Sequence, residues 1–231
     1  ILSEDGTDRF RRTLLLIGRK NTKSETCSAL TLTELILGKP GSDLVCSSND
    51  DMQANILYEA INTMRLMIDP EQLDTWKNQQ HIKCTLNDSK VFKLSDRTRN
   101  KEGRNIDFAV VDEVHEMKDN VIIKSIEQSQ SLKENPKLII ITTEGFVNDG
   151  FLDAELIKAR SILNGEDDSI SADRYLPWLY TQDSESEVWS NPETWYKSNP
   201  TLGIVKRWDY MKEQVDAAKK SNADRAFTLS K

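Results

Sequence analysis

An apolar run that leads through a short polar loop into a helix constrains this fold more than any other feature of the chain. The run spans residues 14–17 and predicts a strand over residues 13–17. From Ser24 onward, apolar residues recur at helical spacing as far as Gly38, shortly before Pro40. A loop in this place binds phosphate well, because unpaired N–H groups and the helix dipole at a helix N-terminus favour anions. The loop consists of Gly18, Arg19, Lys20, Asn21, Thr22, Lys23 and Ser24.

This loop matches the usual phosphate-binding pattern only at its end. That pattern is G-x-x-x-x-G-K-S/T, in which the glycines let backbone N–H groups approach the phosphates. Here Ile17 and Thr22 occupy the two glycine positions, so only Lys23 and Ser24 match. A Lys-Ser pair after an apolar run is, by itself, more typical of an exposed turn. If the loop binds phosphate, we expect a helical or extended backbone at Thr22, because a side chain disfavours positive φ.

Two adjacent carboxylates follow a second apolar run. Residues 106–111 predict a buried strand, and Asp112 and Glu113 come directly after it. Alone, this pattern is more typical of a core strand that ends at solvent-facing acids. Because a strand, a Lys-Ser loop and a helix precede it in that order, the pair indicates the Walker A and Walker B parts of a P-loop ATPase.

In that chemistry each residue type has a role. Lys23 neutralises β- and γ-phosphate oxygens, and Ser24 ligates Mg²⁺ through its hydroxyl. Asp112 holds the same ion, directly or through water, because Mg²⁺ prefers carboxylate ligands and retains waters. Glu113 polarises the attacking water as general base. The expected cofactors are therefore ATP and Mg²⁺.

Three polar residues near these acids have two interpretations each. Thr142 and Thr143 end the apolar strand expected over residues 138–143, where they sense the γ-phosphate or simply end the strand. His115 either positions water or is a satisfied surface histidine, and we favour the surface histidine. The sequence alone leaves both alternatives open for the threonine pair.

The rest of the chain predicts an α/β fold. Near-continuous apolar strands alternate with helices, which indicates a mostly parallel, doubly wound sheet covered on both faces. We expect a P-loop NTPase of the ASCE type with three α/β/α layers and a small C-terminal helical or linker extension. The ATPase core is expected over residues 1–165, and the C-terminal part of the domain with its linker over residues 166–231. Further strands are expected over residues 43–47, 81–85, 90–94 and 174–181, and further helices over residues 52–67, 121–131, 152–163 and 208–218.

Two packing predictions accompany this fold. The helix over residues 52–67 carries a stripe that we expect to face the core. Trp189, Trp195 and Tyr196, which cluster around Pro192 and Pro200, are expected to cap a core. The stripe consists of Met52, Ile56, Ala60, Met64 and Met67.

Composition excludes several classes of protein. The formal net charge of −7 argues against a generally basic nucleic-acid binder. No apolar run is long enough to span a membrane. Two histidines exclude a histidine-rich metal site, and Cys27, Cys46 and Cys84 lie too far apart for metal ligands. The cysteines therefore indicate reduced thiols in a cytosolic protein.

A basic loop precedes the Asp112 strand. Residues 95–105 include Arg97, Arg99, Lys101 and Arg104. Phosphoryl transfer needs a further cation on the transition-state charge, often an arginine. Arg19 can supply it within the subunit, and the loop can supply it to a neighbouring subunit, with Arg104 the first candidate and Arg99 the second. A solvated basic face is the more common fate of such a charge run.

The ordered motifs resemble one known family, the ATPase (motor) domain of the large terminase subunit of tailed double-stranded-DNA bacteriophages. Its later part is similar to Pro192-Glu193-x-Trp195 and Asn199-Pro200-x-Leu202-Gly203 here. The resemblance implies that Arg19, Lys23 and Ser24 bind ATP and Mg²⁺, that Asp112 and Glu113 drive hydrolysis, and that Thr142 and Thr143 couple hydrolysis to movement. The motifs that carry it are Arg19-Lys20-Asn21-x-Lys23-Ser24, Val111-Asp112-Glu113 with His115, and Ile141-Thr142-Thr143-x-Gly145-Phe146.

By the same resemblance, the domain works as a ring on the phage portal in the host cytoplasm, where it moves double-stranded DNA into a procapsid. The small terminase subunit is a further expected partner. The family also has an upstream adenine-contacting segment and a downstream metal-dependent nuclease domain. Because neither is visible in this sequence, we expect a fragment without a DNA-cleavage site.

Two other functions remain open from sequence. Asp112-Glu113-Val114-His115 fits the box of a DExH-type nucleic-acid helicase, although such enzymes need a second motor domain and this chain is too short for one. A non-catalytic nucleotide-binding scaffold is the other alternative, because the loop lacks its glycines. ATP turnover measured separately from ATP binding distinguishes the scaffold from the ATPase.

Overall fold

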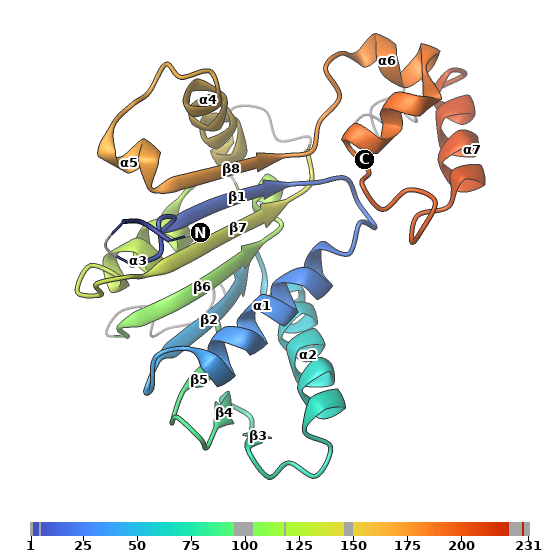
Figure 1. Cartoon of the computed structure of the whole chain (residues 1–231). Helices are drawn as coiled ribbons and strands as arrows, with labels where there is room; N and C mark the ends of the chain where they lie inside the picture. The colour runs from blue at the N-terminus through green and yellow to red at the C-terminus, as the bar shows by residue number, and fades with distance from the viewer. Residues whose placement is uncertain are drawn as a thin grey trace.

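One eight-stranded sheet runs through the computed structural model (Figure 1). The structure describes residues 2–4, 6–94, 104–117, 119–145, 150–221 and 228. The strand order is β3-β4-β5-β2-β6-β7-β1-β8, and every pairing from β5 to β8 is parallel. The strands are β1 (Arg12–Leu16), β2 (Asp43–Ser48), β3 (Thr75–Lys77), β4 (His81–Cys84), β5 (Lys90–Leu94), β6 (Ile106–Asp112), β7 (Lys137–Thr142) and β8 (Tyr175–Leu179).

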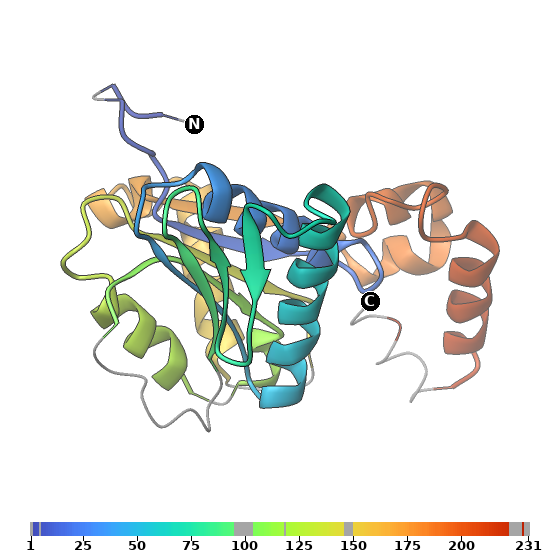
Figure 2. The same ribbon diagram turned by 90° about the horizontal axis from the view of Figure 1, so that it is seen from below.

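Helices cover both faces of this sheet, as the two views in Figures 1 and 2 show. On one face, α1 (Lys23–Leu37) and α2 (Asp51–Ile68) pack through a core that includes Leu35 and Ile61. On the other, α3 (Val121–Ser129) and α4 (Phe151–Leu163) pack through a core that includes Ile126. The three predicted layers and the mostly parallel sheet are confirmed.

The order of the strands brings three loop-bearing strand ends together. β7 lies between β1 and β6, with Leu16 beside Thr142 and Asp112 beside Ile141. A strand inserted between the loop strand and the Asp112 strand is the ASCE arrangement predicted from sequence. Since all three strands are parallel, their carboxyl ends lie at one edge, where ligands bind in open α/β sheets.

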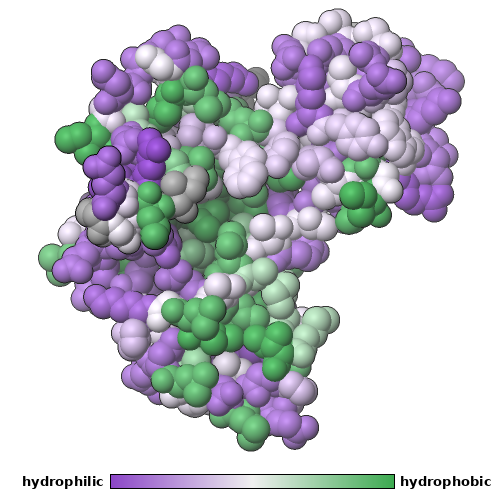
Figure 3. All heavy atoms as spheres, viewed as in Figure 1, coloured by the Kyte–Doolittle hydropathy of each residue, from purple (hydrophilic) through white to green (hydrophobic). Residues whose placement is uncertain are grey.

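The predicted apolar stripe of α2 is wrong about which side faces the core. Met52 and Met67 are 77% and 76% exposed, whereas Leu57 and Ile61 are buried. The helix carries two apolar stripes, and the packing of α2 against α1 and β2 buries the one that contains Ala54, Leu57, Tyr58, Ile61 and Arg65. Figure 3 shows the apolar surface that remains over α1 and α2. Helical spacing alone could not decide between the two stripes.

The C-terminal region extends beyond the carboxyl ends of the strands (Figures 1 and 2). It contains α6 (Glu185–Ser190), the 3-10 helix η2 (Pro192–Lys197) and α7 (Trp208–Ala218). These elements bury a separate small core that includes Trp195 and Met211. The expected aromatic core is therefore confirmed, and Trp195 and Tyr196 both pack against Trp208.

The sequence missed the shortest elements. β3 extends the expected hairpin of β4 and β5 as an antiparallel edge, and α5 (Ile170–Asp173) precedes β8. β8 pairs with β1, so the sheet continues to Leu179, past the division expected at residue 165. In the part of the chain that the structure describes, no helix is both long and apolar enough to cross a membrane.

Candidate functional site

The loop between β1 and α1 has an unusual backbone. Thr22 precedes the helix with φ 58° and ψ 27°, in the left-handed region, and Lys20 has φ 65°. The expectation of a helical or extended Thr22 is therefore wrong. The loop turns sharply before Lys23. The left-handed backbone at Thr22 costs roughly 1 kcal/mol, whereas glycine adopts it at little cost.

Lys23 reaches across from α1 to both predicted acids. Its Nζ lies 2.6 Å from Glu113 Oε1 and 3.5 Å from Asp112 Oδ1. Lys23 is 8% exposed and Asp112 is 7% exposed, so these charges meet where water screens them poorly. The structure thus brings together residues that are about ninety positions apart in sequence.

Ser24 lies beside the same carboxylate. Its Oγ donates to Asp112 Oδ2 at 3.4 Å. A hydroxyl and a carboxylate oxygen are hard oxygen ligands of the kind that Mg²⁺ takes, with waters completing its octahedron. The donor set at Ser24 and Asp112 therefore fits a magnesium ion.

Glu113 stands at the end of β6 in a left-handed conformation, with φ 55°. Its N–H donates to Ile141 O at 3.1 Å and to Asp112 Oδ1 at 2.8 Å. This turn brings both carboxylates within 3.5 Å of the same Lys23 ammonium. Backbone strain of this kind concentrates at functional sites.

The two acids have opposite pKa shifts. Burial raises the pKa of Asp112, and the nearby Lys23 offsets only part of that effect. Burial also pushes the pKa of Glu113 upward, but the hydrogen bond from His115 and the charge of Lys23 outweigh it and lower the pKa to about 2. Glu113 is therefore held as a carboxylate.

His115 is buried, so the surface interpretation is wrong. It belongs to the short 3-10 helix η1 (Val114–Glu116) and is 6% exposed. Its Nδ1 lies 3.0 Å from Glu113 Oε2 and 3.2 Å from Thr142 Oγ1. The end of β7 covers the imidazole, which the linear sequence does not reveal.

The predicted threonine pair lies next to this histidine. Thr142 and Thr143 are both fully buried. The Thr142 hydroxyl donates to Thr143 O at 2.8 Å and accepts from the His115 N–H at 3.2 Å. Thr143 Oγ1 has no hydrogen-bond partner among the described residues. Thr142 is therefore linked to Glu113 through His115.

Asn21 fastens the loop to the C-terminal region. Its amide donates to Gly18 O at 2.8 Å and to Asn199 Oδ1 at 3.0 Å, and its carbonyl oxygen accepts from the Thr201 hydroxyl at 2.7 Å. Gly18 N donates to Ser198 O at 3.1 Å. The Asn21 side chain is thus directed toward the C-terminal turn. Its amide both donates and accepts, so one side chain holds the loop and that turn together.

A cavity of about 840 Å³ opens over the loop. Lys23 and Glu113 lie on its inner side, and residues 205–213 of the C-terminal region form the facing wall. The sequence did not predict that residues 205–213 face the loop. The Asn-Pro-x-Leu-Gly motif at residues 199–203, just before them, was the available signal. The wall contributes Val205, Lys206, Arg207, Asp209, Tyr210 and Glu213, and the loop contributes Arg19, Lys20, Thr22, Lys23, Ser24 and Glu25.

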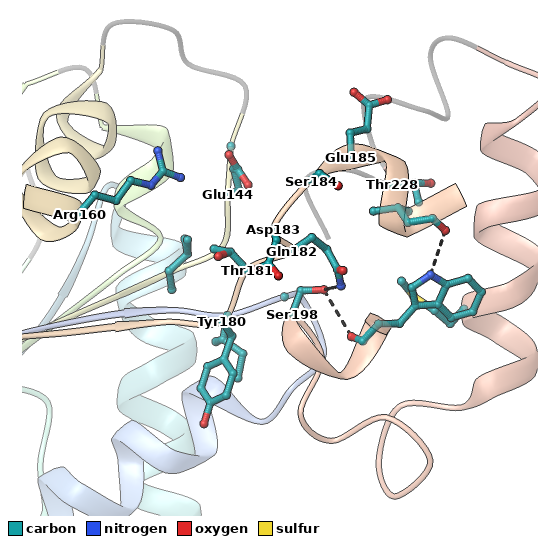
Figure 4. Close-up of a pocket in the computed structure, with 17 residues that line it drawn as sticks. Glu144, Arg160, Tyr180, Thr181, Gln182, Asp183, Ser184, Glu185, Ser198 and Thr228 are labelled. Atoms are coloured by element: carbon teal, nitrogen blue, oxygen red, sulfur yellow. Dashed lines mark hydrogen bonds between the residues drawn. The ribbon is translucent and has the colours of Figure 1, made fainter. Parts of the chain in front are cut away.

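A second cavity, of about 480 Å³, is lined by Gly18, by Glu144 and Arg160, and by residues of the C-terminal region (Figure 4). Glu144 and Arg160 border it on the side of the sheet, and Gln182 donates to Ser198 Oγ at 3.0 Å in its middle. Neither Lys23 nor the adjacent acids line it. Lys23, Ser24 and Glu113, which the sequence predicts to act on phosphates, line the larger cavity.

Arg104 lies away from this site. It precedes β6 at the amino end of the strand, whereas Asp112 closes the carboxyl end. Its guanidinium carbon stands 3.6 Å from the centre of the Phe92 ring. The second candidate, Arg99, lies outside the described residues, as do Arg97, Lys101 and Phe146.

Comparison with known proteins agrees with this geometry. Residues 4–161 match the family described as the terminase large subunit, ATPase domain. This chain belongs to that family. The match covers the loop, both acids, His115 and the threonine pair, so all of the residues singled out at the strand ends lie inside it.

Individual terminases are similar over most of the chain. The terminase large subunit of Lactococcus phage p2 is 24% identical over 212 residues, which cover 88% of this chain and 38% of that protein. The HK97 bacteriophage large terminase has a TM-score of 0.82 at 21% identity, over 98% of this chain and 46% of that one. The large terminase ATPase domain of Thermus phage P74-26 has a TM-score of 0.57 at 20% identity, over 83% and 82%. These structures share the fold, and the chain spans less than half of the p2 relative.

Proposed function

We propose that this terminase ATPase domain hydrolyses ATP in the cavity over residues 18–24. One observation carries the proposal: Lys23, Asp112 and Glu113 meet at the carboxyl edge of an ASCE sheet, beneath a cavity that opens at a helix N-terminus. The same arrangement gives a triphosphate a cation, backbone N–H groups and a base. The loop therefore binds the phosphates although Thr22 replaces its glycine.

The roles of the side chains follow from their positions. Lys23, whose Nζ lies 2.6 Å from Glu113 Oε1, turns toward the phosphates when the nucleotide binds. Glu113 then accepts the proton of the attacking water. Ser24 and Asp112 hold Mg²⁺, which supplies charge neutralisation at the phosphates when bound. Arg19, on the rim of the cavity, contacts the nucleotide.

DNA translocation is the activity that this hydrolysis serves. Membership of the family supports it, and the Phi-28 gp11 DNA packaging motor shares the fold with a TM-score of 0.50 at 12% identity. We infer that the chain acts within a ring of identical subunits in the host cytoplasm, moving double-stranded DNA into a procapsid. The portal and the small terminase subunit are its partners, and Thr142 and Thr143 couple hydrolysis to movement.

Glu113→Gln and Lys23→Ala separate hydrolysis from binding. Glu113→Gln keeps the shape of the site but removes the base, so we expect ATP affinity to stay and turnover to fall by on the order of 10²-fold or more. Lys23→Ala removes a cation that also contacts the ground-state phosphates, so it should weaken binding itself. Phosphate release measures turnover, and a fluorescent ATP analogue measures affinity.

The control variant is Glu71→Gln, an exposed acid in the turn after α2 that lines neither of the two cavities. It should keep wild-type turnover. Unchanged turnover in a folded Glu113→Gln protein would show that Glu113 is not the general base. Tight ATP binding by the wild type without turnover, even with DNA and Mg²⁺ present, supports the scaffold instead.

A further inference from the structure

His115 joins two parts of the site that the proposed reaction treats separately. On one side its Nδ1 lies 3.0 Å from Glu113 Oε2. On the other, both its Nδ1 and its backbone N–H lie 3.2 Å from Thr142 Oγ1. The histidine thus stands between the expected base and the strand end that carries the threonine pair.

Hydrogen-bond chemistry fixes the direction of these contacts. A carboxylate only accepts, so the Nδ1 that faces Glu113 carries the proton. The Thr142 hydroxyl donates its own proton to Thr143 O at 2.8 Å, which leaves its lone pairs for His115. Nδ1 has hydrogen-bond geometry toward Thr142 Oγ1 at 3.2 Å, whereas Glu113 Oε2 lies 3.0 Å from the same nitrogen as a close polar contact without that geometry. A shift of Thr142 therefore changes how far the Nδ1–H turns toward Glu113.

Glu113 depends on such a contact. Its backbone leaves the strand in a left-handed conformation, so β6 does not fix the carboxylate. Lys23 holds Oε1 at 2.6 Å, while His115 faces Oε2. When Lys23 turns to a bound phosphate, the contact with His115 continues to orient the base.

Gly145 ties the chain after β7 to the imidazole. A Cβ built at Gly145 would lie 2.6 Å from His115 Cδ2, 2.7 Å from its Cβ and 2.9 Å from its Cγ. The glycine backbone therefore rests directly on the ring, and any side chain there displaces it. A movement of residues 142–145 cannot leave His115 in place.

We propose that His115 is a positioning residue: it orients the Glu113 carboxylate for the proposed hydrolysis and links it to residues 142–145. It does not exchange a proton with the substrate. The state of the segment after β7 then sets the orientation of the base, and the hydrolysis site and the coupling segment act on each other through one imidazole. This inference rests on the proposed function, because it needs Glu113 to be the base.

Three variants test it. His115→Ala removes the ring, His115→Asn returns an N–H donor near the position of Nδ1, and Gly145→Ala displaces the ring without removing it. We expect His115→Ala to lower kcat by roughly tenfold to a hundredfold, as misplaced catalytic groups do, with ATP affinity within about twofold of the wild type. His115→Asn should recover most of the loss.

The double variant shows whether Gly145 acts through the histidine. Gly145→Ala should lower kcat alone but cause no further loss in a His115→Ala background, since contacting residues are not additive. The control is His81→Ala, the other histidine of the chain, which packs between Trp76 and Phe92 and should leave kcat unchanged. Thermal melting confirms that each variant folds.

The outcomes separate this inference from the proposed function. A wild type without turnover, or a Glu113→Gln protein as active as the wild type, removes the proposed function. Turnover that Glu113→Gln abolishes but His115→Ala and Gly145→Ala leave intact overturns the role of His115 alone. If His115→Ala does not fold, His115→Asn takes its place in the double variant. Losses in kcat from His115→Asn and Gly145→Ala that add fully in that double variant also overturn the role of His115.

Discussion

The two ends of the central sheet hold their charges in different ways. At the amino ends, Arg12 pairs with both Glu127 and Glu155, and Lys133 pairs with Asp107 at 2.7 Å. Arg12 and Lys133 thus each have a carboxylate partner. At the carboxyl ends, one cation, Lys23, lies within 3.5 Å of two adjacent acids. The ion pairs of Arg12 and Lys133 leave no carboxylate unpaired among these residues, whereas the two acids at Lys23 outnumber their single cation.

The backbone differs between the two ends as well. Five non-glycine residues have a left-handed φ in the part of the chain that the structure describes, and three of them, Lys20, Thr22 and Glu113, lie at the carboxyl edge. The buried hydroxyl of Thr143 has no partner among the described residues at this edge either. Strained residues cost of order 1–3 kcal/mol each and persist where the surrounding structure holds them.

The contrast teaches where stability and chemistry reside in one sheet. The ion pairs of Arg12 at the amino end fasten α3 and α4 to β1, because Glu127 and Glu155 come from those helices. At the carboxyl end two carboxylates share one ammonium, so a bound cation could pair with the second carboxylate. Substitutions at the two ends should therefore change different measurements.

The largest expected effect is that of Arg104, because an amino-end residue that affects turnover would contradict the division between a stabilising end and a reactive end. Arg104 lies at the amino end, yet we propose that it acts on the nucleotide of a neighbouring subunit. Arg104→Ala should then lower turnover by about 10³-fold, the lower part of the range for a transferred arginine. Mixing Arg104→Ala with Glu113→Gln protein should restore some turnover, since an intact site forms where an Arg104 donor meets a Glu113 acceptor. Phosphate release at several protein concentrations measures both effects.

The matched control is Arg11→Ala, another amino-end arginine, whose guanidinium bonds to Glu134 O at 2.9 Å. It should leave turnover unchanged. Activity that is independent of protein concentration and unaffected by Arg104→Ala and Arg99→Ala excludes both arginines and leaves the division between the two ends intact.

Arg12→Ala sharpens the comparison from the side of stability. The substitution leaves Glu155 without the cation it pairs with and leaves Glu127 with the more exposed Lys124, so we expect a loss of about 2 kcal/mol, below the value for a fully buried pair. Urea unfolding measures the free energy, and turnover at 25 °C should not change.

The control for Arg12 is Arg9→Ala, which removes an exposed pair with Asp173 and should not shift the unfolding midpoint. A drop in turnover of the folded Arg12→Ala protein would mean that the amino end takes part in the chemistry.

Thr22→Gly has the smallest expected effect. Glycine relieves the left-handed strain at Thr22 but enlarges the freedom of the unfolded chain, so stability should change by less than about 1 kcal/mol. ATP affinity should stay near that of the wild type, because the loop already has the required shape. Isothermal titration measures it. An affinity gain of tenfold or more would show that the native loop is compromised and would favour the scaffold.

Much of the fold could be predicted because its signals are local. β2, β5, β6 and β7 are short apolar runs, and α1 and α7 show helical spacing between clear boundaries. The meeting of Lys23 with Asp112 also followed from sequence, since carboxyl ends of parallel strands share one edge. β3 and α5, with three and four residues, are too short to show a period.

Packing decided the features that the sequence left open or indicated wrongly. α2 carries two apolar stripes, and only its contacts with α1 and β2 select Leu57 and Ile61 over Met52 and Met67. His115 follows two acids in a polar stretch, which suggests the surface, but the end of β7 covers it. Burial depends on what a distant segment places over a residue.

By itself, then, the sequence determined the α/β class, the strand and helix that frame the loop, and the pair of acids at a strand end. The spacing of hydrophobic residues is a local property, so it can be read from the sequence alone. Only the tertiary structure decided that Asn21 is fastened to Asn199 and Thr201, nearly two hundred residues later, and that Thr22 and Glu113 adopt left-handed backbones. A backbone held against its own preference is imposed by contacts from elsewhere in the chain, and no local pattern records them.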